Sequence, residues 1–131
     1  MELKDLLSLA AEAQKNAYAP YSNFHVGACI LTESGNTYTG CNFENASYGA
    51  TICAERCAAS CAIAAGERKF AAIAIVADAL AWPCGICRQV LREFACGPEM
   101  KVVCAAAGSE DYQVKTLEEI LPESFGPEYL L

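Results

Sequence analysis

Positive charge is scarce in this sequence. Its 131 residues include 9 lysines and arginines against 16 acidic residues, which gives a net charge of -7. Proteins that bind a polynucleotide usually present a basic stripe to the phosphates. The closest approach to one, residues 67–69, is mixed in sign. Long nucleic acid is therefore not an expected partner.

Long apolar runs and phosphate-binding loops are missing too. No stretch approaches the roughly 20 apolar residues that cross a bilayer, and residues 1–5 are too charged to open a signal peptide. We therefore expect no membrane contact and a cytoplasmic location. Without a glycine-rich phosphate loop, a nucleotide cofactor is not expected either. The single histidine, His25, is expected to have a structural or surface role rather than to bind metal.

The apolar content, 54% against 19% charged residues, is sufficient for a packed core. No repeat or linker divides the chain, so we expect one domain over residues 1–131. The residue patterns predict helices over 3–17, 53–65 and 85–96, and strands over 26–31, 36–42, 70–76, 101–106 and 112–114. A last helix is expected after Thr116, which forms a capping box with Glu119. This order predicts an α/β fold, a three-layer α/β/α sandwich with a mixed five-stranded sheet.

Cysteine, by contrast, is abundant, with nine in the chain. An odd number without a signal peptide argues against a secreted disulfide scaffold and favours metal ligands or catalytic groups. Cys53 stands at one predicted helix start, and Cys84 and Cys87 span another. Helix N-termini favour thiolates, so these three cysteines are candidate zinc ligands. We expect the other six to be small apolar groups of the interior.

Three protein ligands leave the fourth position of a tetrahedral zinc to water, which is typical of a catalytic site. Zinc lowers the pKa of such a water toward about 7. Glu55 follows Cys53 by two positions and can reach the open position without being a ligand. Three thiolates leave one excess negative charge on the site, and Arg56 can offset it by donating to the sulfurs. Arg88 is a weaker candidate for the same role.

Simpler interpretations of these residues remain open. Taken alone, Cys84 and Cys87 could also be a pair of buried or redox-active thiols, and Arg56 could be an ordinary surface arginine. A glutamate two positions after a cysteine or histidine, followed by Pro-Cys-x-x-Cys, is nevertheless the pattern of zinc-dependent deaminases.

The chain closely resembles the small homotetrameric cytidine deaminases over nearly its whole length. The resemblance is carried by residues 18–24 (YAPYSNF), 26–28 (VGA), 40–48 (GCNFENASY), 53–56 (CAER), 83–90 (PCGICRQV), 121–122 (LP) and 125–127 (FGP). It implies zinc-dependent conversion of cytidine and deoxycytidine to the uracil nucleosides in pyrimidine salvage, with Glu55 as the proton shuttle.

The resemblance also implies the residues that bind the nucleoside. Phe24 is expected to stack near the pyrimidine, and the Ala54 backbone to contact the base. Asn42 and Glu44 are expected to hydrogen-bond the ribose. Without the resemblance, they could equally be polar residues at the solvated edge of a loop. The remaining expectation is that residues of one subunit reach a neighbour's site within a homotetramer, namely Ala46, Tyr48 and Phe125.

One position departs from the family pattern. Trp82 stands just before Pro83, where such enzymes commonly carry serine, and the connection from Asp78 is somewhat short. We expect the ring to reshape the mouth of the site or to pack against another subunit. Two rival functions follow: a deaminase of another aminopyrimidine compound such as blasticidin S, and a non-enzymatic zinc module with a closed four-cysteine site.

Overall fold

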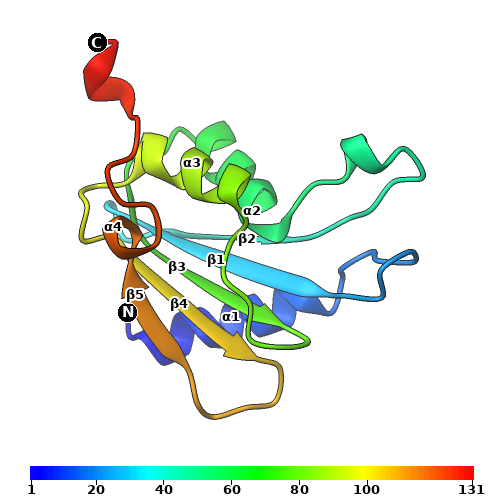
Figure 1. The fold of residues 1–131 in the computed structure, drawn as a ribbon. Coiled ribbons are helices and arrows are strands. Elements are labelled where there is room, and N and C mark those ends of the chain that lie inside the picture. Colours follow the sequence, from blue (N-terminus) through cyan, green and yellow to red (C-terminus); the bar gives the residue numbers. More distant parts are fainter.

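One mixed sheet of five strands runs through the molecule, and the computed structural model describes residues 1–131 (Figure 1). The strands lie in the order β2-β1-β3-β4-β5, and their bounds are β1 (Val26–Thr32), β2 (Thr37–Cys41), β3 (Phe70–Ala77), β4 (Lys101–Ala106) and β5 (Gln113–Thr116). The helices are α1 (Leu3–Gln14), α2 (Ala54–Ala64), α3 (Gly85–Phe94) and α4 (Leu117–Ile120), with 3-10 turns η1 (Tyr48–Ala50) and η2 (Pro127–Tyr129).

Helices cover both faces of this sheet, α1 on one side and α2 with α3 on the other (Figure 1). Strands β3 and β4 are parallel, and every other neighbouring pair is antiparallel. The expected three-layer α/β/α sandwich with a mixed five-stranded sheet is therefore confirmed. None of the helices has the length and apolar character that a bilayer crossing requires.

Strand β3 is the centre of the apolar interior. Its side chains alternate between two buried clusters, because successive residues of a strand point to opposite faces. Ile73 and Ile75 join the cluster under α2 and α3, whereas Ala74 and Val76 join the cluster under α1. A strand covered on both faces needs an unbroken apolar sequence, which explains residues 70–77.

Helix α2 approaches the sheet most closely at Gly40 of β2. A Cβ atom at this position would lie 2.4 Å from the backbone nitrogen of Ala58 and 2.8 Å from the carbonyl oxygen of Ala54. Only hydrogen leaves room for backbone against backbone at this spacing. Gly40 therefore sets the depth at which the first turns of α2 sit on the sheet.

The capping box expected at the last helix is confirmed. The Thr116 hydroxyl accepts from the backbone N–H of Glu119 at 3.2 Å, and the Glu119 carboxylate accepts from the backbone N–H of Thr116 at 2.8 Å. The adjoining strand β5 runs from Gln113 to Thr116, two residues further than expected, because Val102 and Lys101 continue the antiparallel ladder to Lys115 and Thr116.

Two helices, α1 and α3, end two or more residues before the positions that the sequence predicts. Helix α1 stops at Gln14 rather than at residue 17, because the backbone N–H of Tyr18 donates to the carbonyl of Asn42 at 3.0 Å. Helix α3 stops at Phe94 rather than at residue 96, because the N–H of Cys96 donates to Phe70 at 2.9 Å. In both places a long-range backbone contact replaces the next helical turn.

Replacing Gly40 with alanine should lower the free energy of unfolding by about 1–3 kcal/mol, because α2 must move away from β2. The matched control is Gly49→Ala, since a Cβ at Gly49 has no neighbour within 4 Å. Thermal unfolding of both variants measures the difference. Equal unfolding temperatures for the two would contradict the close approach.

Candidate active site

Two helices begin at cysteines whose side chains face each other across the same face of the sheet. Cys53 is the N-cap of α2 and Cys84 the N-cap of α3, both with extended backbone. Each cap carbonyl accepts the first helical hydrogen bond, from Cys57 at 3.1 Å and from Arg88 at 2.9 Å. Cys87 lies in the first turn of α3. Both helix starts thus direct free backbone N–H groups toward one point, where negative charge is favoured.

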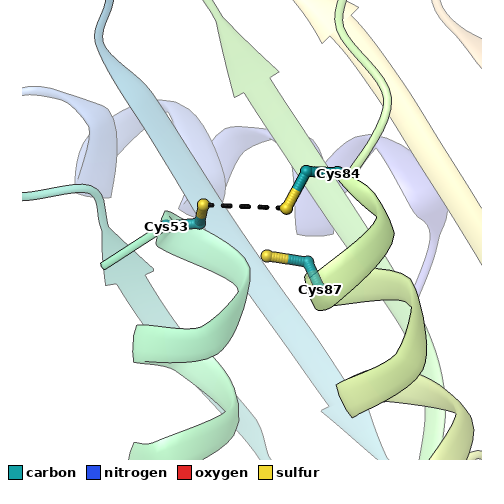
Figure 2. Close-up of side chains that lie close together, drawn as sticks. All are labelled: Cys53, Cys84 and Cys87. Atoms are coloured by element: carbon teal, nitrogen blue, oxygen red, sulfur yellow. Dashed lines mark hydrogen bonds between the residues drawn. The ribbon is translucent and has the colours of Figure 1, made fainter. Parts of the chain in front are cut away.

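The three sulfurs meet at that point (Figure 2). They all lie within 4.8 Å of one another, and the Sγ atoms of Cys53 and Cys84 are 4.0 Å apart. Zinc–sulfur bonds of about 2.3 Å in a tetrahedral site put the sulfurs about 3.8 Å apart. The donor set therefore fits zinc with little adjustment, and it leaves one coordination position without a protein ligand.

The surroundings of Cys53 favour its thiolate form. Hydrogen bonding from the Cys87 thiol, assisted by the Arg56 guanidinium, lowers the pKa of Cys53 to about 5. The same hydrogen bond, together with burial, raises the pKa of Cys87 well above its ordinary value. Metal binding must displace the proton of the Cys87 thiol, so zinc uptake is linked to proton release.

Glu55 lies in the first turn of α2 beside the sulfurs and is 6% exposed. Burial raises the pKa of its carboxyl to about 7, and the negative charge of Cys53 acts in the same direction. A carboxyl that titrates near neutral pH can accept and return a proton in one reaction cycle. The expected acid–base residue therefore has suitable surroundings.

Arg56 reaches the sulfurs as expected. Its Nη2 atom donates to Cys53 Sγ at 3.5 Å, and contact with Cys53 raises the pKa of the guanidinium. Its buried Nε–H has no partner. Arg88 does not share this role, because its guanidinium donates to the carbonyl oxygens of Pro83 at 2.6 Å and Ile120 at 2.7 Å. It fixes the loop before Cys84 to α4 instead.

Residues expected to bind the nucleoside converge on the segment before β1. The Asn42 side chain is 9% exposed; its Oδ1 accepts from Val26 N–H and its Nδ2 donates to the Phe24 carbonyl, both at 2.9 Å. The Glu44 carboxylate accepts from the N–H groups of Tyr21 and Ser22 at 2.9 and 3.1 Å. Phe24 itself is half-buried.

Tyr48 and Ala46 lie in the long loop between β2 and α2, and both are exposed. Tyr48 lies edge-on to the ring of Tyr21, with centroids 5.9 Å apart. A surface pocket of about 390 Å³ is lined by Tyr21, Ser22, Glu44, Tyr48 and Thr51. Ala54, by contrast, is fully buried as the first residue of α2.

Phe125 is not brought to the other expected site residues within one chain. It lies in the C-terminal segment, far from the loop of residues 42–53 in Figure 1. Its ring is 56% exposed and stacks on Tyr129, with centroids 5.3 Å apart. Gln89 of α3 donates to the Phe125 carbonyl at 2.9 Å and fixes this segment to the helix.

The structure shows how Trp82 packs and corrects the expectation for two of the cysteines. The Trp82 ring is partly buried against the core under α2 and α3, with Lys115 Nζ 5.6 Å from its centroid. It thus helps to anchor the loop before Pro83 to its own chain; that it also reshapes the mouth of the site or packs against another subunit stays a prediction. Cys61 and Cys96 are exposed rather than interior, because α2 and the turn after α3 present these positions to solvent.

Asp78 and Gln14 were not among the expected site residues, yet their side chains bind the backbone of His25. The signal in the sequence is slight: Asp78 is the first charged residue after the apolar strand β3. Its partner His25 is 53 positions away, so no local pattern connects them.

Fold and donor set together define a zinc enzyme with a buried carboxyl beside its metal site. A family model for the cytidine and deoxycytidylate deaminase zinc-binding region matches residues 1–106. The chain belongs to this family, and it is a hydrolytic deaminase that uses zinc.

Individual relatives agree with this assignment. A cytidine deaminase of Sporosarcina psychrophila is 42% identical over 132 residues, covering 99% of this chain and 96% of the relative. The crystal structure of cytidine deaminase from Burkholderia pseudomallei superimposes with a TM-score of 0.88 at 45% identity, over 95% of this chain and 100% of that one. The crystal structure of cytidine deaminase from Mycobacterium tuberculosis superimposes with a TM-score of 0.84 at 37% identity, over 96% of this chain and 98% of that one.

Replacing Cys84 with alanine should remove zinc from the purified protein, because two thiols hold the ion far less tightly than three. The control is Cys61→Ala, which removes an exposed thiol of α2 outside the cluster. Metal analysis after dialysis should find zinc in the wild type and the control only. Full occupancy in Cys84→Ala would show that this thiol is no ligand.

Proposed function

We propose that this enzyme hydrolyses cytidine and 2′-deoxycytidine to uridine and 2′-deoxyuridine, with release of ammonia. The observation that carries the proposal is the position of Glu55, a buried carboxyl in the same helical turn as Cys53 of the three-sulfur cluster. Relatives described as cytidine deaminases support the choice of substrate, because they match over nearly the whole chain.

Cys53, Cys84 and Cys87 would hold the zinc ion. When bound, zinc supplies the Lewis acidity that brings the ionisation of water close to neutral pH. Glu55 then moves the protons: its carboxylate takes one from the attacking water and delivers it to N3 as the water oxygen adds to C4. It next takes the proton of the new C4 hydroxyl and passes it to the amino group, which leaves as ammonia when the C4–N bond breaks and the C4 carbonyl forms. Arg56 offsets the negative charge of the thiolates.

The unused hydrogen-bonding capacity of two side chains supports a ribosyl substrate. Asn42 uses one acceptor and one donor site on the backbone, which leaves a second N–H and a second lone pair. The hydroxyl of Ser22 lowers the pKa of Glu44, so this residue is an anion that can accept from a sugar hydroxyl. We assign the 3′-hydroxyl to these two residues, the pyrimidine to Phe24, and a base contact to the Ala54 backbone.

We further propose that residues 1–131 act as one domain within a cytoplasmic homotetramer whose sites are shared between subunits. The exposure of Phe125, Tyr48 and Ala46 supports this arrangement, because large apolar rings at 56% and 74% exposure favour contact with another surface. Phe125 would enter a neighbour's site, because it does not reach the site of its own chain.

The two rival functions are less well supported. A closed four-cysteine module would need a fourth thiol, and the cluster contains three. A deaminase specific for blasticidin S is not favoured, because Trp82 packs inward and the relatives compared are cytidine deaminases. Following the change in absorbance on deamination, with blasticidin S in place of cytidine, tests this alternative.

Changing Glu55 to glutamine should lower turnover of cytidine by about 10²-fold or more, because the amide cannot shuttle protons. Zinc content should stay at the wild-type level. The decrease in cytidine absorbance measures turnover, and Glu93→Gln, an exposed glutamate of α3, serves as the control. Turnover close to the wild-type value in Glu55→Gln would refute its role.

Sharing of sites predicts that two inactive variants complement each other. Phe125→Ala leaves each subunit's own proton shuttle intact, whereas Glu55→Gln leaves its phenylalanine available to a neighbour. Co-expression should restore activity at up to about one quarter of the sites, since half of the subunits keep Glu55 and half of their neighbours keep Phe125. No recovery in purified mixed assemblies would mean that Phe125 serves only its own chain.

A further inference from the structure

Side chains hold the residues that lead into β1, Phe24 and His25, together with the N–H of Val26, the first residue of the strand. Asn42 binds two of their backbone groups, the Phe24 carbonyl and the Val26 N–H, each at 2.9 Å. Two further side chains complete the set at His25. Its N–H donates to Asp78 Oδ2 at 2.7 Å, and its carbonyl accepts from Gln14 Nε2 at 3.0 Å.

Asp78 and Gln14 also contact each other. Gln14 Nε2 donates to Asp78 Oδ1 at 3.3 Å, so one amide group bridges the carbonyl of His25 and the carboxylate. The imidazole adds a contact from Nδ1 to Asp78 Oδ2 at 2.9 Å. We call Asp78, Gln14 and the His25 backbone the polar clasp. It joins the end of α1, the start of β1 and the end of β3.

The clasp lies where the sheet can no longer hold this segment. The antiparallel pairing of β1 with β3 ends at Val26 and Ala77, so the next residue pair is His25 and Asp78. The carboxylate takes the place of the missing backbone acceptor. Hydrogen bonds from the His25 N–H and ring lower the pKa of Asp78, so it is an anion at neutral pH. Bonds to an anion are stronger than neutral ones.

Asp78 is also the first residue of the segment that leads from β3 to the metal cluster. Six positions separate Asp78 from Cys84, and Arg88 and Trp82 fix the end of this connection to the body of the protein. Through the clasp, the segment that bears Phe24 and the loop that bears Cys84 are tied to the same end of β3.

We propose that Asp78, with Gln14, is a positioning residue that fixes Phe24 relative to the metal cluster. The inference rests on the proposed function, in which Phe24 contacts the pyrimidine. Asp78 touches no substrate itself and acts through the backbone of His25. Its loss should weaken nucleoside binding, whereas the sulfurs and Glu55 should keep their places.

The test is the kinetics of Asp78→Asn and Asp78→Ala with cytidine. Losing charge-assisted hydrogen bonds should raise KM about tenfold, while kcat and zinc content change much less, because binding rather than chemistry is affected. The asparagine variant keeps its volume and one acceptor, so it should fold even where the alanine variant does not. An unchanged KM in folded Asp78→Asn overturns the proposal.

A double-mutant cycle separates positioning of Phe24 from general support of the fold. In a Phe24→Ala background, the added change Asp78→Asn should raise KM little further, because the ring on which the clasp acts is gone. Additive effects on KM would show that Asp78 acts through something else and would contradict the inference.

Glu67 offers a matched control at the other end of β1. Its carboxylate accepts from Ser34 Oγ at 2.8 Å, Asn36 Nδ2 at 3.0 Å and Tyr38 Oη at 3.1 Å, and so holds the hairpin. Glu67→Gln should lower the unfolding temperature and leave KM unchanged; an equal rise in KM would overturn the inference. Failure of the proposed function would be distinct, since the wild type would then not deaminate cytidine at all.

Discussion

The meeting of two helix N-termini over one face of the sheet is the constraint on which the site depends. Three thiols within 4.8 Å of one another are stable as a metal site only where thiolates are favoured. Two sets of free backbone N–H groups and the Arg56 guanidinium supply that environment. The close packing of α2 against Gly40 fixes the start of α2, and the hydrogen bond from Arg88 to the Pro83 carbonyl fixes the start of α3. The sheet thus serves as a platform for a charge arrangement that neither helix could provide alone.

Features encoded by neighbouring residues were predictable. The spacing of Cys84 and Cys87, the glutamate two positions after Cys53, and the capping box at Thr116 all express contacts within a single turn, which local sequence specifies. The layers were predictable for a similar reason, since the unbroken apolar run of β3 requires cover on both faces. The same holds for the zinc cofactor, because its ligands follow from helix starts that the sequence marks.

Features that depend on distant partners were not. Helix α1 ends early because Tyr18 bonds to the backbone of Asn42, and no pattern within residues 3–17 announces that contact. Arg88 resembles Arg56 in its place beside a cysteine, yet two carbonyl oxygens take up its guanidinium. The inward packing of Trp82 and the contact of Asp78 with His25 likewise arise from pairs far apart in the chain.

The anchoring of Trp82 has an evolutionary consequence. Because this ring and the Arg88 guanidinium fix the last residues before Cys84, the preceding residues 79–81 contribute little to the position of this ligand. Insertions there can vary among descendants without disturbing coordination. The chain thus separates a short segment that can vary in length from the helix starts whose positions the metal ligands require.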